Sequence, residues 1–198
     1  MISGLRQSWL NRQTAILLIS IALFVGFATQ AEHFLEIRTQ LEILRVTAFA
    51  LPIALPLTYL VIAGEIDLSI GSNYGLCSVL TAMAIVQWGW NPWAAAGLAV
   101  ATGGLIGLFN GVATVKLKVP SFILTIGMLS LLRGLALVVT MGLSIDIPSS
   151  IRSSFFSAAG GTIATIPVQV LWAAAALIVS GVTPVSYTHL TLPTKRIV

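Results

Sequence analysis

The sequence predicts an all-α integral membrane protein, a polytopic helical bundle with about six transmembrane helices. Of its 198 residues, 57% are hydrophobic and only 8% are charged, whereas a soluble domain carries about 25% charged residues. The mean hydropathy is +1.00. A soluble protein of this size needs far more polar surface to cover its core. A lipid bilayer is therefore the expected surrounding.

Apolar segments of about 20 residues, the length that crosses a bilayer, divide the chain into candidate spans. The first follows Arg6 and Arg12; it is longer than a signal-peptide core and has no small-residue cleavage site, so a retained helix is expected. Pro52 and Pro56 lie inside the second span and predict a kinked or locally opened helix. The expected spans are residues 14–31, residues 46–63, the run from Asp67 to Gln87, residues 94–115, the run from Phe122 to Gly142, and residues 166–182.

Several features between and within these spans have simple structural interpretations. Residues 32–45 hold five charges in amphipathic spacing and predict an interfacial helix or an extension of the second span. The turn signal QWGWNPW places three tryptophans, expected as interfacial anchors, before the fourth span. Gly103, Gly107 and Gly111 recur at four-residue spacing and predict close packing of a neighbouring helix. The single cysteine excludes a disulfide within the chain, and no metal site is expected.

The distribution of basic residues predicts the orientation. With a cytoplasmic N-terminus, the inside segments carry Arg6, Arg12, Lys116 and Lys118, and the outside segments carry three arginines (Arg38, Arg45 and Arg152). The short Lys-Leu-Lys turn and the N-terminus then agree with the positive-inside rule. The net charge of +4 does not indicate nucleic-acid binding, because the basic residues lie at the edges of apolar runs and not among aromatic residues.

Glu65 and Asp67 are two carboxylates within the otherwise apolar stretch VIAGEIDLSIGS. Charged residues inside a membrane usually face a cavity, a partner helix or a transport path, so both are candidates for an ion or substrate site. The structural alternative is an irregular turn after the second span. There Asp67 would accept backbone N–H groups and Ser69 would cap the next helix, with flanking glycines supporting the turn.

Three more polar side chains lie well inside apolar runs. Asn73 and Asn110 each need a partner in lipid, and hydrogen bonding between helices is the default expectation. Arg133 either pairs with a helix-end carbonyl or an acid such as Asp67, or extends toward an interface. The candidate pathway-lining or helix-locking residues are thus Glu65, Asp67, Asn73, Asn110 and Arg133.

The chain shows no enzyme signature. It lacks a phosphate-binding G-x-x-x-x-G-K-[ST] loop, an H-E-x-x-H helix and a G-x-S-x-G elbow. No catalytic residue and no cofactor are therefore expected.

Two separated motifs resemble one family. VIAGEIDLSIGS (residues 61–72) resembles the GGIDLS-VGS stretch of bacterial ABC-importer permeases for ribose, xylose and related sugars. GLFNGVATVKLKVPSFILTIGMLSLLRGLALVVTMG (residues 107–142) is similar to the same family's Asn-Gly, basic turn, Val-Pro-Ser-Phe-Ile and Arg-Gly pattern. The resemblance covers most of residues 46–142, with both motifs in the family's order.

This resemblance implies a permease in the bacterial inner membrane that forms the path for a monosaccharide. Its implied partners are cytoplasmic ATPase subunits, a periplasmic sugar-binding protein, and a second permease subunit in a homodimer or heterodimer. The ATPases would hydrolyse ATP, and the permease would open alternately to each side.

The sequence departs from the family at three points. Glu65 stands where the family commonly has Gly. Family permeases carry a coupling loop and more helices after the sixth span, so residues 1–184 are expected to be a partial, C-terminally truncated permease domain. The tail VSYTHLTLPTKRIV (residues 185–198) breaks the composition abruptly and is expected to be a non-native appendage.

A second hypothesis belongs to another class of transporter. In an ion-coupled secondary transporter, Glu65 or Asp67 would bind a proton or Na⁺ at a break between helices. Dependence of uptake on ATP or on an ion gradient distinguishes the two hypotheses.

Overall fold

The computed structural model describes residues 3–151 and 154–187, with side chains assigned from residue 14 to residue 181 within those ranges. The chain divides into two units, Met1–Thr47 and Ala48–Val198. Each unit is considered by itself below.

The first unit contains α1 (Ser3–Gln30) and the beginning of α2 (Ile37–Ile62). In the turn between them, the ring of Phe34 packs on Phe24 and Phe27, with ring centroids 5.4 and 5.8 Å apart. Because α2 begins at Ile37 and runs without interruption into the second apolar segment, the amphipathic residues extend that helix and do not form a separate one.

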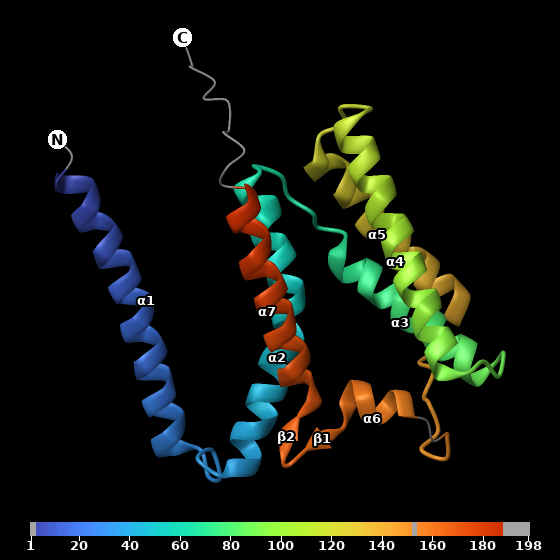
Figure 1. Ribbon diagram of the computed structural model, residues 1–198, viewed down its shortest axis with the longest axis horizontal. Helices are drawn as coiled ribbons and strands as arrows, with labels where there is room; N and C mark the ends of the chain where they lie inside the picture. The colour runs from blue at the N-terminus through green and yellow to red at the C-terminus, as the bar shows by residue number, and fades with distance from the viewer. Residues whose placement is uncertain (1–2, 152–153, 188–198) are drawn as a thin grey trace. The chain divides into compact units, whose positions relative to one another are not determined.

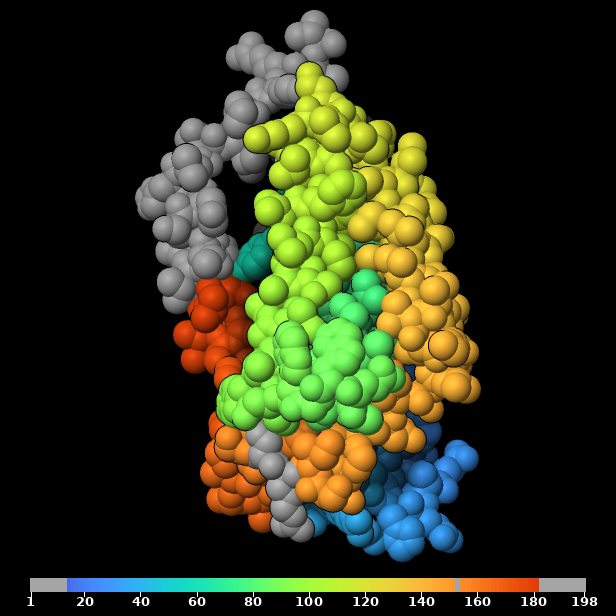
Figure 2. Space-filling model, turned by 90° about the vertical axis from the view of Figure 1, so that its right-hand side faces the viewer, coloured from blue at the N-terminus to red at the C-terminus, as the bar shows by residue number. Residues whose placement is uncertain are grey.

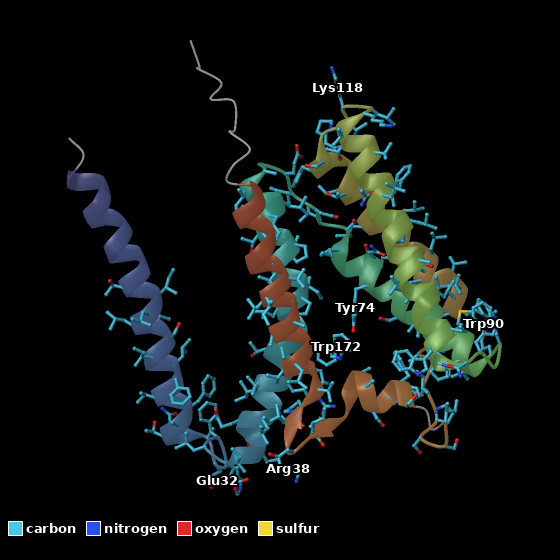
Figure 3. The ribbon with its side chains drawn as sticks, viewed as in Figure 1. Glu32, Arg38, Tyr74, Trp90, Lys118 and Trp172 are labelled. Carbon is cyan, nitrogen blue, oxygen red and sulfur yellow. The ribbon has the colours of Figure 1, made fainter. Side chains whose placement is uncertain are left out.

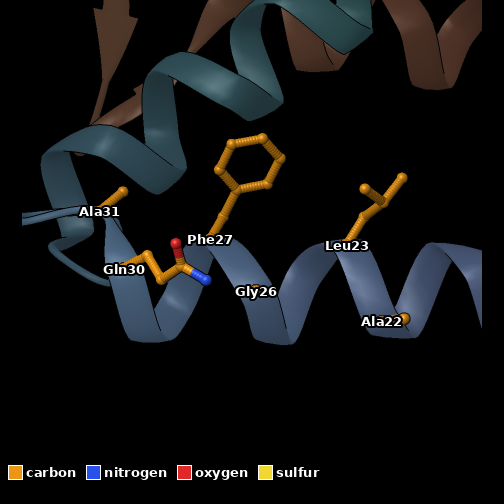
Figure 4. A pocket seen from close by; sticks show the side chains of 6 residues that line it. All are labelled: Ala22, Leu23, Gly26, Phe27, Gln30 and Ala31. Atoms are coloured by element: carbon orange, nitrogen blue, oxygen red, sulfur yellow. The ribbon is translucent and has the colours of Figure 1, made fainter.

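A shallow pocket of about 360 Å³ lies against α1 in this unit (Figure 4). One helix and the residue after it supply its whole lining, which contains a single polar side chain. Such a surface cannot surround a ligand. The lining residues are Ala22, Leu23, Gly26, Phe27, Gln30 and Ala31.

Three helices form the packed part of the second unit: α3 (Ile70–Val86), α4 (Pro92–Val115) and α5 (Ser121–Thr140). α3 contacts both other helices, and α4 also touches α5, so the last two lie side by side in Figure 2. Small side chains permit close packing at the far end of α3, where Ala84 and Ala95 are fully buried. The local sequence therefore sets how closely α3 and α4 approach.

Turn residues fix the ends of these helices. Asn91 is the N-cap of α4, and its side-chain oxygen accepts the backbone N–H of Trp93 at 2.9 Å, while Pro92 occupies the first helical position. α5 ends at Met141 and Gly142, both with positive φ (52° and 74°). The connections expected from QWGWNPW and KLKVPSF are thus found between the expected helices.

The remaining elements follow α5. They are the short helix α6 (Ser154–Gly160), the strands β1 (Thr162–Ile163) and β2 (Ile166–Pro167), and α7 (Val168–Tyr187). The two strands pair antiparallel with Ile163 opposite Ile166. Only a polar stretch was expected before α7, so α6 and the hairpin are additions to the predicted all-α class. α7 runs beside α2 in Figure 1, and the hydroxyl of Tyr59 in α2 donates to the carbonyl of Ser180 in α7 at 2.5 Å.

Among the described residues, three helices are long and apolar enough to cross a membrane: α2, α4 and α5. Shorter apolar helical segments cover residues 14–30, 70–86 and 168–181. Many large apolar side chains of the long helices face outward, as in Val100 of α4 at 77% exposure and Val138 of α5 at 75%. This arrangement is suited to lipid. The all-α membrane class therefore holds, while the number of six transmembrane helices stays a prediction.

The predicted division at residue 184 also stays a prediction. α7 continues through Tyr187, and the rest of the predicted tail, residues 188–198, lies outside the described residues.

Candidate functional site

The candidate site begins where α2 ends. Gly64 has φ +78°, and its N–H donates to the carbonyl of Val61 at 3.0 Å, while the N–H of Glu65 donates to Leu60 at 2.9 Å. These two bonds form the Schellman motif that commonly ends a helix at a left-handed glycine. The chain thus turns sharply at Gly64. The other glycine expected to support the turn, Gly71, instead lies in the first turn of α3.

Asp67 organises the start of α3 through one carboxylate oxygen. Its Oδ1 accepts the backbone N–H of Ser69 at 2.7 Å and the hydroxyl of Ser69 at 2.6 Å. Ser69 occupies the N-cap position and is only 1% exposed, but its side chain makes no capping bond to the helix. Ser69 thus occupies the expected cap position, and Asp67 accepts a backbone N–H as expected, while the Ser69 hydroxyl donates to Asp67 and makes no bond to the helix.

Asn110 of α4 completes a chain of polar groups. Its side-chain Nδ2 donates to the Oγ of Ser69 at 3.0 Å. The Ser69 hydroxyl donates to Asp67, and its oxygen accepts from Asn110, which orients the amide. Asn110 is 6% exposed, and its Oδ1 is buried with no hydrogen-bond donor among the described residues.

The same turn is tied to α5 by Ile66. Its N–H donates to the Oγ of Ser121, and its carbonyl accepts from the Oγ1 of Thr125, both at 3.4 Å. Thr125 is 2% exposed. We call residues 66–69, together with Asn110, Ser121 and Thr125, the polar lock. The polar lock joins the end of α2 to α3, α4 and α5.

Asn73 contacts α4 one turn further along α3. Its Nδ2 donates to the carbonyl of Gly103 at 3.4 Å, and its Oδ1 accepts from Cys77. A Cβ at Gly103 would lie 3.4 Å from the sulfur of Cys77, whereas Gly107 and Gly111 have no described neighbour within 4 Å. Only the first glycine of the predicted repeat thus lies against a described helix.

Glu65 and Arg133 are not joined to the polar lock. Neither side chain makes a hydrogen bond or ion pair within the described part of the chain. Glu65 is half-buried and Arg133 is exposed. The expected alternative that Arg133 pairs with Asp67 is not found among the described residues; the hydrogen bonds of the Asp67 carboxylate come from Ser69.

The chemistry of the polar lock is interhelical hydrogen bonding. No group of three His, Cys, Asp or Glu side chains that could hold a metal ion occurs among the described residues. Sequence reasoning missed Ser121 and Thr125 altogether. The available signal was weak: hydroxyl residues at the start of apolar helices also cap or bond to their own backbone.

A second set of contacts lies at the opposite end of α3 and α4. The indole Nε1 of Trp93 donates to the Oγ of Ser154 at 3.0 Å, and that of Trp172 donates to the carbonyl of Ala158 at 2.9 Å. Figure 3 shows Trp172 on the side of α7 nearest α6. The ring of Trp93 also packs edge-to-face on Phe155 at 5.3 Å. Two tryptophans from different helices thus hold α6.

These features define a helical membrane protein whose helices are joined by buried hydroxyl and amide groups around a turn. Residues 40–188 match the family described as "Branched-chain amino acid transport system / permease component". The chain belongs to this family of membrane permeases.

Individual relatives carry more specific names. The chain is 33% identical over 138 residues to the xylose transport system permease protein XylH of Haemophilus influenzae, an alignment covering 69% of this chain and 37% of that protein. It is 32% identical over 144 residues to the autoinducer 2 import system permease protein LsrC of an Enterobacter species, covering 72% and 42%. LsrC of Yersinia pestis (strain Pestoides F) is 31% identical over the same length, with 72% and 41% covered.

The chain therefore spans about two fifths of the length of these relatives. No solved structure matches it. The relatives do not favour the ion-coupled alternative, since all three are named as permease proteins of transport or import systems.

Proposed function

We propose that this chain is the membrane-embedded permease subunit of an ATP-driven importer and forms part of the path for a monosaccharide. The observation that carries this proposal is the family match over residues 40–188, together with 33% identity to a xylose permease. The subunit itself catalyses no reaction. ATP hydrolysis belongs to separate cytoplasmic ATPase subunits, which drive the permease by binding its two states differently.

The remaining partners follow from this role. A periplasmic sugar-binding protein delivers the monosaccharide, and a second permease subunit, identical or different, completes the path. In the bacterial inner membrane with a cytoplasmic N-terminus, the polar lock and the Lys116–Lys118 turn face the cytoplasm, which agrees with the positive-inside rule. The tryptophan contacts around α6 then lie at the periplasmic side, where interfacial tryptophans are favoured.

Within this function, Asp67 and Asn110 act as helix-locking residues. Both belong to one hydrogen-bonded chain through Ser69, which is almost fully buried. Asn73 adds a weaker contact from α3 to α4 at 3.4 Å. In a low-dielectric surrounding, a polar group of the lock that loses its hydrogen-bond partner raises the free energy of the protein. The polar lock therefore favours one relative position of these helices.

Arg133 and Glu65 act as pathway-lining residues. Arg133 lies near the middle of α5, and a helix of 20 residues spans about 30 Å, the thickness of the hydrocarbon core. An exposed guanidinium at that depth is costly against lipid and is expected to face water or protein. We assign the half-buried carboxylate of Glu65 to the cytoplasmic end of the same transport path. Glu65 makes no ion pair within the described part of the chain.

Uptake measurements test the proposed function. In cells lacking the gene, uptake of radiolabelled xylose and other monosaccharides should fall and should return when the gene is supplied in full. Depleting ATP while keeping the proton and Na⁺ gradients should stop uptake. Uptake that survives ATP depletion but stops when the gradients collapse would contradict the proposal and would favour ion binding at Glu65 or Asp67.

Replacing Arg133 by Gln tests its pathway role. We expect uptake to fall about tenfold or more, because the charge near the bilayer centre is lost, with the melting temperature unchanged. Lys116→Gln in the cytoplasmic turn is the matched control and should leave uptake near the wild-type rate. A large loss of stability in Arg133→Gln would show that the side chain holds the fold and does not line the path.

A further inference from the structure

A hollow of about 390 Å³ lies between α3, the end of α5 and the segment that follows α5. Volumes of this order are typical of sites for small ligands. We call this hollow the α3–α5 pocket. α3 contributes Ser78, Val79 and Ala82, α5 contributes Ala136, Leu137 and Thr140, and residues 142–145 close the pocket. Because α3 and α5 pack against each other within the second unit, two of its walls are held in place.

Three hydroxyl-bearing residues from three separate segments line this pocket. The hydroxyls of Ser78 and Thr140 donate to carbonyls of their own helices, those of Tyr74 at 2.8 Å and Ala136 at 2.9 Å. Each oxygen therefore keeps a lone pair for an incoming donor. Ser144 makes no hydrogen bond within the described part of the chain, through its side chain or its backbone, so it can both donate and accept.

The rest of the pocket lining indicates a neutral ligand. None of its residues is charged, and aliphatic side chains such as Val79, Leu137 and Ile145 lie among the hydroxyl-bearing residues. A charged ligand that leaves water would need an opposite charge at this place. A sugar ring instead presents apolar C–H faces and a rim of hydroxyl groups, which both donate and accept hydrogen bonds. The α3–α5 pocket therefore suits a small neutral polyol.

The α3–α5 pocket lies away from the polar lock along α3 and α5. Ile66 bonds to Ser121 and Thr125 at the beginning of α5, whereas the pocket is lined by later turns of both helices. In the orientation proposed above, the pocket end of α5 faces the periplasm. Arg133 and Leu137 are four residues apart and thus lie on the same side of α5. The proposed pathway-lining guanidinium therefore begins one turn from the pocket, on the side of the polar lock.

We propose that the α3–α5 pocket is the entry site of this subunit, where a monosaccharide bonds through its hydroxyl groups to Ser78, Thr140 and Ser144 before it moves toward Arg133. The direction of movement rests on the proposed importer function; the preference of the pocket for a neutral polyol does not. Each of these hydrogen bonds replaces one to water, so each adds little net free energy. Weak binding suits an entry site, because the sugar must also leave it.

Binding of xylose to the purified protein in lipid nanodiscs tests the pocket directly. Saturation-transfer NMR should show transfer from the protein to the ring protons of xylose, because these protons contact aliphatic side chains. Xylonate, the carboxylate analogue, should give a much weaker signal, because the pocket offers no opposite charge. Absence of transfer to xylose, or equal transfer to both compounds, would overturn the proposed site.

A bulky side chain placed in the pocket locates the binding. Ser144→Trp starts from an exposed loop position that lines the pocket, and it should remove most of the transfer to xylose. Ser149→Trp is the matched control, because Ser149 is also exposed in the segment after α5 but does not line the pocket. Equal transfer in the two variants would place xylose elsewhere and would overturn the proposal.

Thr140→Val tests the role of the hydroxyl groups. It removes one hydroxyl and keeps a β-branched side chain, so we expect xylose binding to weaken about two- to tenfold, the equivalent of one neutral hydrogen bond. Thr81→Val is the matched control. The Thr81 hydroxyl likewise bonds to a carbonyl of its own helix, that of Cys77, but Thr81 does not line the pocket. Equal affinities in the two variants would show that the Thr140 hydroxyl does not bind the sugar.

Uptake in cells separates the entry site from the proposed function. At equal membrane levels, Ser144→Trp should lower xylose uptake about tenfold or more, because the sugar must pass this pocket, and Ser149→Trp should not. Unchanged uptake in Ser144→Trp would overturn the entry site and leave the proposed function standing. If the wild-type protein imports no sugar, the proposed function fails, while binding in nanodiscs still decides whether the pocket accepts a neutral polyol.

Discussion

The two ends of the α3–α4 pair are joined to neighbouring segments by different chemistry. At the polar lock, short hydroxyl and amide side chains are almost completely buried, with Ser69 at 1% and Asn110 at 6% exposure. At the other end, the indoles of Trp93 and Trp172 hold α6, although the two residues are 52% and 59% exposed. One end is thus joined by buried hydrogen bonds of short side chains, and the other by large aromatic side chains at the surface.

This difference determines how strictly each set of contacts must keep its geometry. A buried serine or asparagine that loses its partner finds no water, so its hydrogen bonds must keep their geometry. An interfacial indole can exchange its partner for water and keeps its apolar contacts when it shifts. We therefore expect the polar lock to define the relative positions of the helices and the tryptophans to anchor α6 with some freedom. Five substitutions, each with a control or a reference variant, test this comparison.

Ser69→Ala should have the largest effect. It removes the hydroxyl donor to Asp67, which keeps the backbone N–H of residue 69, and it removes the acceptor of the buried Asn110 amide. We expect a loss of about 2–3 kcal/mol in the free energy of unfolding, measured by denaturant titration in detergent micelles. Ser78→Ala is the control, because that hydroxyl bonds only to Tyr74 in its own helix. Equal losses in the two variants would contradict the lock.

Gly64→Ala should follow. A Cβ at Gly64 meets no atom within 4 Å, but φ of +78° is unfavourable for any side chain, so we expect a loss of about 1–2 kcal/mol. Gly104→Ala in α4 also adds a Cβ in open space but at a helical φ, and it should be neutral or slightly stabilising. If both substitutions behave alike in the same titration, the turn does not depend on the left-handed glycine.

Trp93→Phe and Trp172→Phe keep most of the ring and remove the N–H donor. We expect each to cost about 1 kcal/mol or less and to speed hydrogen exchange in α6 without affecting α3 or α5. Trp88→Phe, whose indole nitrogen has no described hydrogen-bond partner, should leave exchange in α6 unchanged. Faster exchange throughout α3–α5 would mean that the tryptophans support the whole bundle.

Asn73→Ala should have the smallest effect, about 0.5 kcal/mol. Its hydrogen bond to the Gly103 carbonyl is long at 3.4 Å, and this carbonyl lies within the helix α4. Asn110→Ala, by contrast, should cost more in the same assay because it leaves Ser69 buried without its amide donor. A larger loss from Asn73→Ala would reverse this ranking.

The sequence was most informative where one residue type determines the local backbone. Asn91 and Pro92 predicted the start of α4, and the turn signal around Lys116 predicted the break before α5. The turn after α2 was also expected, with Gly64 at its start. In each case the physical cause, a cap, a fixed φ or a left-handed φ, lies within a few residues of the effect.

Contacts between distant segments were harder to predict. Asn73 and Asn110 look alike in the sequence, yet only Asn110 bonds to the polar lock, because helix rotation decides which side chain faces the turn. The cap position of Ser69 was expected, but its bond from the distant amide of Asn110 was not, because that contact depends on how α4 packs against α3. The hairpin before α7 gave no signal, since strands of two residues are too short for an alternating pattern.

The left-handed backbone at Gly64 also limits which sequences can form this turn. Because φ is +78° there, an amino acid with a Cβ is disfavoured at position 64 whatever its neighbours are. Selection at this position should therefore act on the backbone conformation and retain glycine, even where the chemistry of the adjacent carboxylates changes.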